Sequence, residues 1–118
     1  GSAGAGRQRG GFGVSYRVRL LRGEAKASFL MDHGRTGPPG ILGGEAGGTN
    51  EIRVSQSDNV CEPEHLSKGE GYLLEADDWV QIRTPGGGGY GPAADRDPDL
   101  IAQDVQRGYF GSLDKTTT

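Results

Sequence analysis

Glycine is the feature that most limits what this chain can fold into, because 23 of its 118 residues are glycine. Most of the glycines fall in three stretches, 1–13, 34–48 and 86–91. Every ordered glycine costs additional backbone entropy, and only 32% of the residues are hydrophobic. The core must therefore be thin, and the composition favours a chain that folds against a partner.

Short β-strands are predicted between the glycine-rich stretches. The clearest begins at Val14, where Val14, Tyr16 and Val18 alternate with polar residues, which is typical of a strand with one buried face and one wet face. The first two strands are separated by a connection of hairpin length, and so are the last two, so we expect two antiparallel hairpins. The predicted strands are 14–20, 26–31, 51–55, 72–75 and 79–84.

One helix is predicted near the end of the chain, over residues 98–107. Asp97 is a suitable N-cap, Pro98 suits the first helical position, and Gly108 ends the helix. Its predicted buried stripe consists of Leu100, Ile101 and Val105. We therefore expect a single mainly β domain over residues 1–118, a small antiparallel sandwich or open barrel with long glycine-rich loops, an N-terminal arm over 1–13 and one C-terminal helix.

The charge and the apolar pattern argue against binding to nucleic acid, insertion in a membrane and secretion. A net charge of -3 does not steer a protein onto nucleic acid or an anionic membrane. No apolar stretch is long enough to cross a membrane, and the sequence shows no secretory leader. A single cysteine, Cys61, cannot form an internal disulfide. We expect a cytoplasmic protein that binds neither nucleic acid nor membrane.

The glycine run in TPGGGGYG, residues 84–91, has two interpretations. Consecutive backbone N–H groups can cradle a phosphate. However, the run lacks the spacing of a Walker motif and has no lysine within or just after it. The favoured interpretation is a close approach of the backbone to another chain, where a Cβ atom would clash. The stretch 37–48 is interpreted in the same way.

A zinc site is the main candidate for metal chemistry. Cys61, His65 and His33 are the only cysteine and histidines of the chain, and thiolate and imidazole are the ligands that Zn²⁺ prefers. Pro63 would allow the turn that brings the first two together. A fourth ligand could come from another subunit or from Glu64, Glu62 or Asp32. The alternative is a half-exposed cysteine with two surface histidines, and no residue is predicted to be catalytic.

Several motifs occur together in one order along the chain. They are RQRGGFG before the first strand, TGPPGILGGEAGG at 36–48, SKG at 67–69, and TPGGGGYG followed by DRDPDLIAQDVQRGY at 95–109. Together they resemble the C-terminal region of the hydantoinase B/oxoprolinase family, from about Gly6 to Tyr109. Members of this family are usually chains several hundred residues longer than this one.

The resemblance implies a role in an ATP-dependent enzyme built with larger subunits, as an obligate hetero-oligomer. The specific expectation is a small structural subunit of a biotin-independent ketone carboxylase similar to acetophenone carboxylase. ATP and bicarbonate would then be used by the complex and not bound by this chain alone. A C-terminal module of an ATP-dependent hydantoinase or 5-oxoprolinase is the alternative within the family. A free-standing binding or adaptor module is the alternative from another class.

Overall fold

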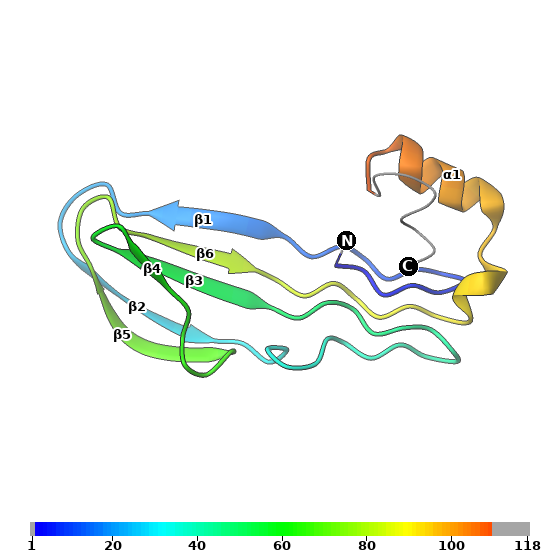
Figure 1. The fold of residues 1–118 in the computed structure, drawn as a ribbon, viewed down its shortest axis with the longest axis horizontal. Coiled ribbons are helices and arrows are strands. Elements are labelled where there is room, and N and C mark those ends of the chain that lie inside the picture. The colour runs from blue at the N-terminus through cyan, green and yellow to red at the C-terminus, as the bar shows by residue number, and fades with distance from the viewer. Residues whose placement is uncertain (1, 110–118) are drawn as a thin grey trace.

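The computed structural model describes residues 2–109 and shows an elongated molecule with extents of 52 × 27 × 17 Å. The strands gather at one end, the glycine-rich segments extend toward the other end, and the helix lies beside them (Figure 1). The strands are β1 (Ser15–Arg19), β2 (Ala25–Leu30), β3 (Glu51–Gln56), β4 (Asn59–Cys61), β5 (Lys68–Leu74) and β6 (Trp79–Arg83), and the helix is α1 (Pro98–Gln106).

The strands form a four-stranded antiparallel sheet in the order β1-β6-β3-β4 and a separate antiparallel pair, β2-β5. The prediction of a mainly β protein with one C-terminal helix is confirmed. The two predicted hairpins are wrong, because β1 pairs with β6 and β2 pairs with β5. The stretch from β1 to β2 runs antiparallel to the stretch from β5 to β6, so the four strands make one long ribbon bent in the middle.

The bend lies where the two connections between the strand pairs cross from one layer to the other. Leu20 donates its N–H to the Asp78 carbonyl and accepts from the Asp77 N–H, which holds the two connections together. The Asp78 carboxylate accepts from the N–H groups of Glu75 and Ser57, both at 2.8 Å. These bonds lower the pKa of Asp78 from its ordinary value. The connections expected to be hairpin turns are therefore corners of the ribbon.

The hydrophobic core lies between the sheet and the β2-β5 pair. Its buried side chains are Ile52 and Val54 of β3 and Leu74 of β5. Partly buried neighbours from both layers pack against them: Leu20, Ala27, Phe29, Met31, Tyr72 and Val80. Three buried apolar side chains among the described residues make a thin core, as the composition predicted.

The apolar face of β1 is not buried, contrary to the prediction. In the antiparallel register Tyr16 lies opposite Ile82, and Val18 lies opposite Val80, so these side chains share one face of the sheet. The β2-β5 pair covers that face over β3, whereas Val14, Tyr16 and Val18 remain 61%, 46% and 56% exposed. The alternation of the sequence is real, but nothing in the described part of the chain covers its apolar side.

Helix α1 begins and ends close to the predicted positions. The Asp97 side chain accepts from the Asp99 N–H, Pro98 occupies the first turn, and Gly108 follows with φ +77°. The predicted stripe of Leu100, Ile101 and Val105 is only half-buried, and the buried residue of the helix is Asp104. Within residues 2–109, no helix has the length and apolar character needed to cross a membrane.

Candidate functional site

The glycine-rich segments form a packed bundle, which we call the glycine bundle (residues 2–13, 37–48 and 84–91). Four of its segments, 8–13, 37–41, 44–48 and 84–91, continue the directions of β1, β2, β3 and β6 away from the strands, and residues 2–6 form a fifth segment (Figure 1). Segment 84–91 lies at the centre, because it exchanges backbone hydrogen bonds with residues Gly4, Gln8, Gly11, Ile41 and Glu45 of the surrounding segments. The bundle is thus held mainly by bonds between main chains far apart in the sequence.

The run of four glycines is explained by the neighbours that surround it. A Cβ atom on Gly86 would meet the Ser2 carbonyl, one on Gly89 would meet the Ala5 carbonyl, and one on Gly88 would meet Pro39, each closer than 3.0 Å. Gly87 faces the Gly10–Gly11 backbone with more room. Positions 86 and 89 face the same neighbouring segment, residues 2–5. This spacing matches the three residues per turn of the polyproline II conformation. Every side of the central segment meets another backbone.

Most glycines of the outer segments lie where the segment faces a neighbouring backbone. Glycines recur every third residue at 37 and 40, at 44 and 47, and at 10 and 13. A Cβ atom at each of these six positions would lie closer than 3.0 Å to the backbone of an adjacent segment. This spacing of three is the sequence signal for the bundle. The interpretation of these glycine-rich stretches as loops overlooks it.

The predicted close backbone approach at the glycine run is therefore present, but the neighbour is the same chain and not a partner. A phosphate cradle does not fit, because the N–H groups of Gly87, Gly89 and Tyr90 already donate to the carbonyls of Gly11, Glu45 and Gln8 at 2.8–2.9 Å. The run serves as the axis of the bundle.

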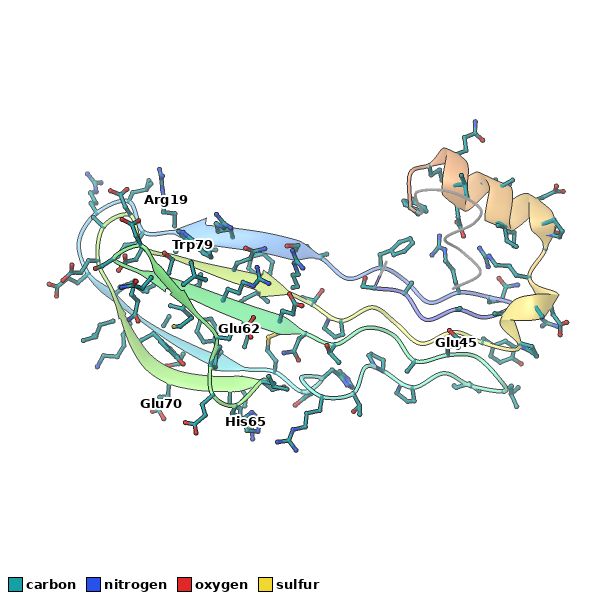
Figure 2. The ribbon with its side chains drawn as sticks, viewed as in Figure 1. Arg19, Glu45, Glu62, His65, Glu70 and Trp79 are labelled. Atoms are coloured by element: carbon teal, nitrogen blue, oxygen red, sulfur yellow. The ribbon has the colours of Figure 1, made fainter. Side chains whose placement is uncertain are left out.

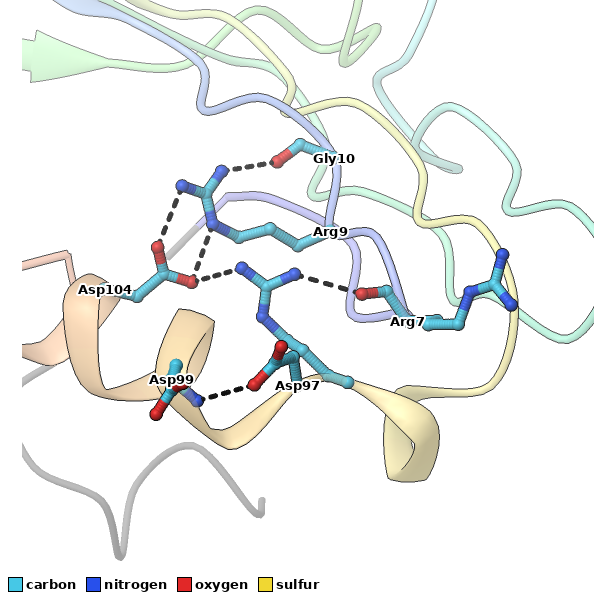
Figure 3. Close-up of polar contacts among 7 residues, drawn as sticks. Arg7, Arg9, Gly10, Asp97, Asp99 and Asp104 are labelled. Atoms are coloured by element: carbon cyan, nitrogen blue, oxygen red, sulfur yellow. Dashed lines mark hydrogen bonds and ion pairs between the residues drawn. The ribbon is translucent and has the colours of Figure 1, made fainter.

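A buried carboxylate attaches helix α1 to the glycine bundle (Figure 3). Arg9 donates from Nε to Asp104 Oδ2 and from Nη2 to Oδ1, both at 3.0 Å, in a bidentate pair. Arg96 donates from Nη2 to Asp104 Oδ2 at 2.8 Å and from Nη1 to the Arg7 carbonyl. We call Arg9, Arg96 and Asp104 the helix clamp.

Electrostatics and stacking favour this arrangement. The hydrogen bonds from Arg9 lower the pKa of the Asp104 carboxyl from its ordinary value, burial opposes the shift, and Arg96 adds to the lowering. The Arg9 guanidinium also lies over the Phe12 ring at 4.4 Å and the Tyr109 ring at 5.3 Å. Sequence reasoning missed the clamp, because Arg9 and Asp104 are 95 positions apart.

The predicted zinc ligands lie on three different elements. Cys61 ends β4 and is exposed, and His65 lies in the connection from β4 to β5 (Figure 2). His33 follows β2, and its Nδ1 contacts the Thr36 carbonyl at 3.0 Å, while His65 Nδ1 accepts from the Ser67 N–H at 3.2 Å. Among residues 2–109, no three His, Cys, Asp or Glu side chains gather in a way that could hold a metal ion. Zinc binding stays an untested prediction.

The possible fourth ligands border different surface hollows. Asp32 and Glu64 each border a hollow that His65 also borders, whereas Glu62 borders a third, next to Pro63. Glu62 instead forms an exposed ion pair with Arg53 at 3.6 Å. A zinc site that includes these groups would need ligands from outside the described residues.

Comparison with known proteins identifies the family. A sequence profile described as hydantoinase B/oxoprolinase matches residues 1–93. An uncharacterized protein of Methanocaldococcus jannaschii, MJ0963, is 36% identical over 105 residues, and the 5-oxoprolinase PfmaA of Pestalotiopsis fici is 38% identical over 101 residues. No solved structure matches the chain. The chain belongs to the hydantoinase B/oxoprolinase family.

The chain is short compared with these relatives. The matches cover 89% and 82% of this chain, but only 18% of the archaeal protein and 8% of the fungal 5-oxoprolinase. The glycine bundle falls entirely within the part that the family profile matches.

Two adjacent glycines allow a matched test of the bundle. Gly88→Ala should destabilise the protein by about 3 kcal/mol, because the methyl group overlaps the Pro39 backbone. Gly87→Ala should change stability by less than about 1 kcal/mol, because its nearest neighbour is 3.3 Å away and its φ is not positive. Thermal unfolding of both variants measures the difference. Equal effects would mean that the bundle does not pack as described.

The helix clamp predicts a pH dependence. Because the folded-state pKa of Asp104 is lowered, its contribution to stability is fully present above the ordinary value of 3.8 and is lost as the pH falls through the lower folded value. Asp104→Asn should cost about 3 kcal/mol at neutral pH and remove this dependence. The NMR signal of the Arg9 Nε–H reports the ionisation of Asp104 locally, because this group donates to the carboxylate. Asp99→Asn is the control, and an Arg9 signal unchanged by Asp104→Asn would contradict the clamp.

Proposed function

We propose that the chain is a structural module of an ATP-dependent enzyme that hydrolyses a ring amide, as in a 5-oxoprolinase or hydantoinase. The observation that carries this proposal is its membership of the hydantoinase B/oxoprolinase family, with 38% identity to a protein named as a 5-oxoprolinase. ATP and the cyclic amide are bound by the larger remainder of the enzyme, to which this chain is permanently attached. The chain contributes shape and not catalytic groups.

The internal packing of the glycine segments supports a structural role. Their N–H groups and carbonyls bond to one another along the bundle, and the helix clamp fixes α1 at its side. Such a bundle is a stiff extension of the sheet, because most of its glycines lie against a neighbouring backbone with no room for a Cβ atom. A stiff extension can hold a fixed distance between two parts of a larger enzyme.

A small subunit of an ATP-dependent, biotin-independent ketone carboxylase of the acetophenone carboxylase type is the second candidate. It differs in substrate, since it joins bicarbonate to a ketone where the first candidate opens a ring amide. The same structural module fits both reactions, because neither assigns a catalytic group to this chain. A free-standing adaptor is the remaining alternative, and it requires no larger partner.

The substrate decides between the candidates. We expect a complex of this chain with its larger family polypeptide to hydrolyse ATP when 5-oxoproline or a hydantoin is added, with ring opening in equal amount. Acetophenone with bicarbonate should give no turnover above background. The isolated chain should show no shift of its unfolding temperature with ATP, and the complex should show one.

Three results would contradict the proposal. Carboxylation of the ketone by the complex would favour the second candidate. An ATP-dependent shift in the isolated chain, or failure to associate with any larger family polypeptide, would favour a module that works alone.

A further inference from the structure

The edge of the sheet at β1 is open and amphipathic. β1 is the terminal strand of the order β1-β6-β3-β4, so one of its sides has no partner strand among the described residues. Leu20 donates to the Asp78 carbonyl, and Thr84 donates to the Val14 carbonyl, at the two ends of the β1-β6 pairing. Because antiparallel pairs alternate, the even-numbered residues of β1 bond to β6. The N–H and carbonyl groups of Ser15, Arg17 and Arg19 therefore face the open side.

The same edge carries an uncovered apolar strip. Val14, Tyr16 and Val18 lie on the core face of the sheet and are 61%, 46% and 56% exposed. An exposed edge strand with an apolar face is a template for pairing with another strand, and natural proteins usually block such an edge. No proline and no bulge interrupts β1, whose register with β6 is continuous from Ser15 to Arg19.

We infer that this edge is the docking site for a β-strand from the larger remainder of the hydantoinase B/oxoprolinase enzyme. The remainder is the natural occupant, because the chain matches only 18% and 8% of two relatives, in which the module is part of a much longer protein. Docking would extend the four-stranded sheet by one strand and cover the apolar strip. The identity of this partner rests on the proposed function.

The chemistry of the edge defines the incoming strand. On the apolar face, it should place β-branched or aromatic residues opposite Tyr16 and Val18. On the other face it meets Arg17 and Arg19. The Arg17 guanidinium lies 3.7 Å from the centre of the Trp79 ring and donates to Gln81 Oε1 at 2.9 Å. Arg19 lies opposite Trp79 in the register (Figure 2). Acidic residues on this face of the partner strand would complement the two arginines.

The test uses a hybrid in which this chain replaces the matching 105 residues of the Methanocaldococcus jannaschii relative. Residue-resolved hydrogen exchange is measured at the edge amides of Ser15, Arg17 and Arg19. We expect them to exchange at least about ten-fold more slowly than unpaired amides, as paired strand amides do. Edge amides that exchange as fast as unpaired ones would overturn the inference.

Two pairs of variants make the test specific. Val18→Lys should restore fast exchange at the edge amides, while the Tyr16 amide stays protected by its bond to β6. Leu73→Lys is the control, at an exposed apolar position on β5, and it should leave the edge amides protected. Arg17→Pro removes an edge N–H and should lower the protection of its neighbours, whereas Arg17→Ala loses the same Trp79 contact and should not. Equal effects within either pair would overturn the inference.

Self-association and function are read from the same hybrid. Edge protection that depends on concentration, with a doubled mass, would assign the edge to a second copy and overturn the inference. A protected edge without ATP-dependent ring opening would leave docking intact and reject the proposed function. Ring-opening activity with an unprotected edge would support the proposed function and overturn the docking inference.

Discussion

The structure depends on one constraint, the close packing of the backbone of the glycine run against the backbones of several other segments of the same chain. Segment 84–91 follows β6 and is enclosed by four other segments. Contacts this close exclude a Cβ atom at Gly86, Gly88 and Gly89, so side chains cannot provide the packing there. Backbone hydrogen bonds replace the hydrophobic core in the glycine bundle, and this explains how a chain with so few buried apolar residues can have a defined shape.

The bundle also positions the other parts of the module. Its segments continue β1, β2, β3 and β6, so their spacing and the pairing of the strands depend on each other (Figure 1). The helix clamp then attaches α1 through Asp104, which forms ion pairs with two arginines at the side of the bundle. The open edge of β1 lies at the other end, in the sheet. A stiff body with an unpaired, apolar edge at β1 suits a module that belongs to a larger enzyme.

Structural features that depend on neighbouring residues were predicted well from the sequence, and pairings between distant residues were not. Helix α1 was predicted because Asp97, Pro98 and Gly108 act within a few residues of one another. Five of the six strands in the described residues were predicted, and β4 (Asn59–Cys61) was not, because its three residues are too few to show an alternation. The partners of the strands were not predicted, because the corners near Leu20 and Asp78 have the length and composition of hairpin turns. The pattern of glycine predicted close backbone approach, but it could not identify the segment approached, and the pairing of Arg9 with Asp104 depends on contacts that no local pattern encodes.

The most direct measurement of the central claim is amide hydrogen exchange at Gly87, Gly89 and Tyr90 in this chain. If the run is the axis of an intrachain bundle, these three amides should be as protected as those of the buried strand β3, with or without a partner. Exchange as fast as that of an exposed loop, or protection that appears only when a partner binds, would contradict the account.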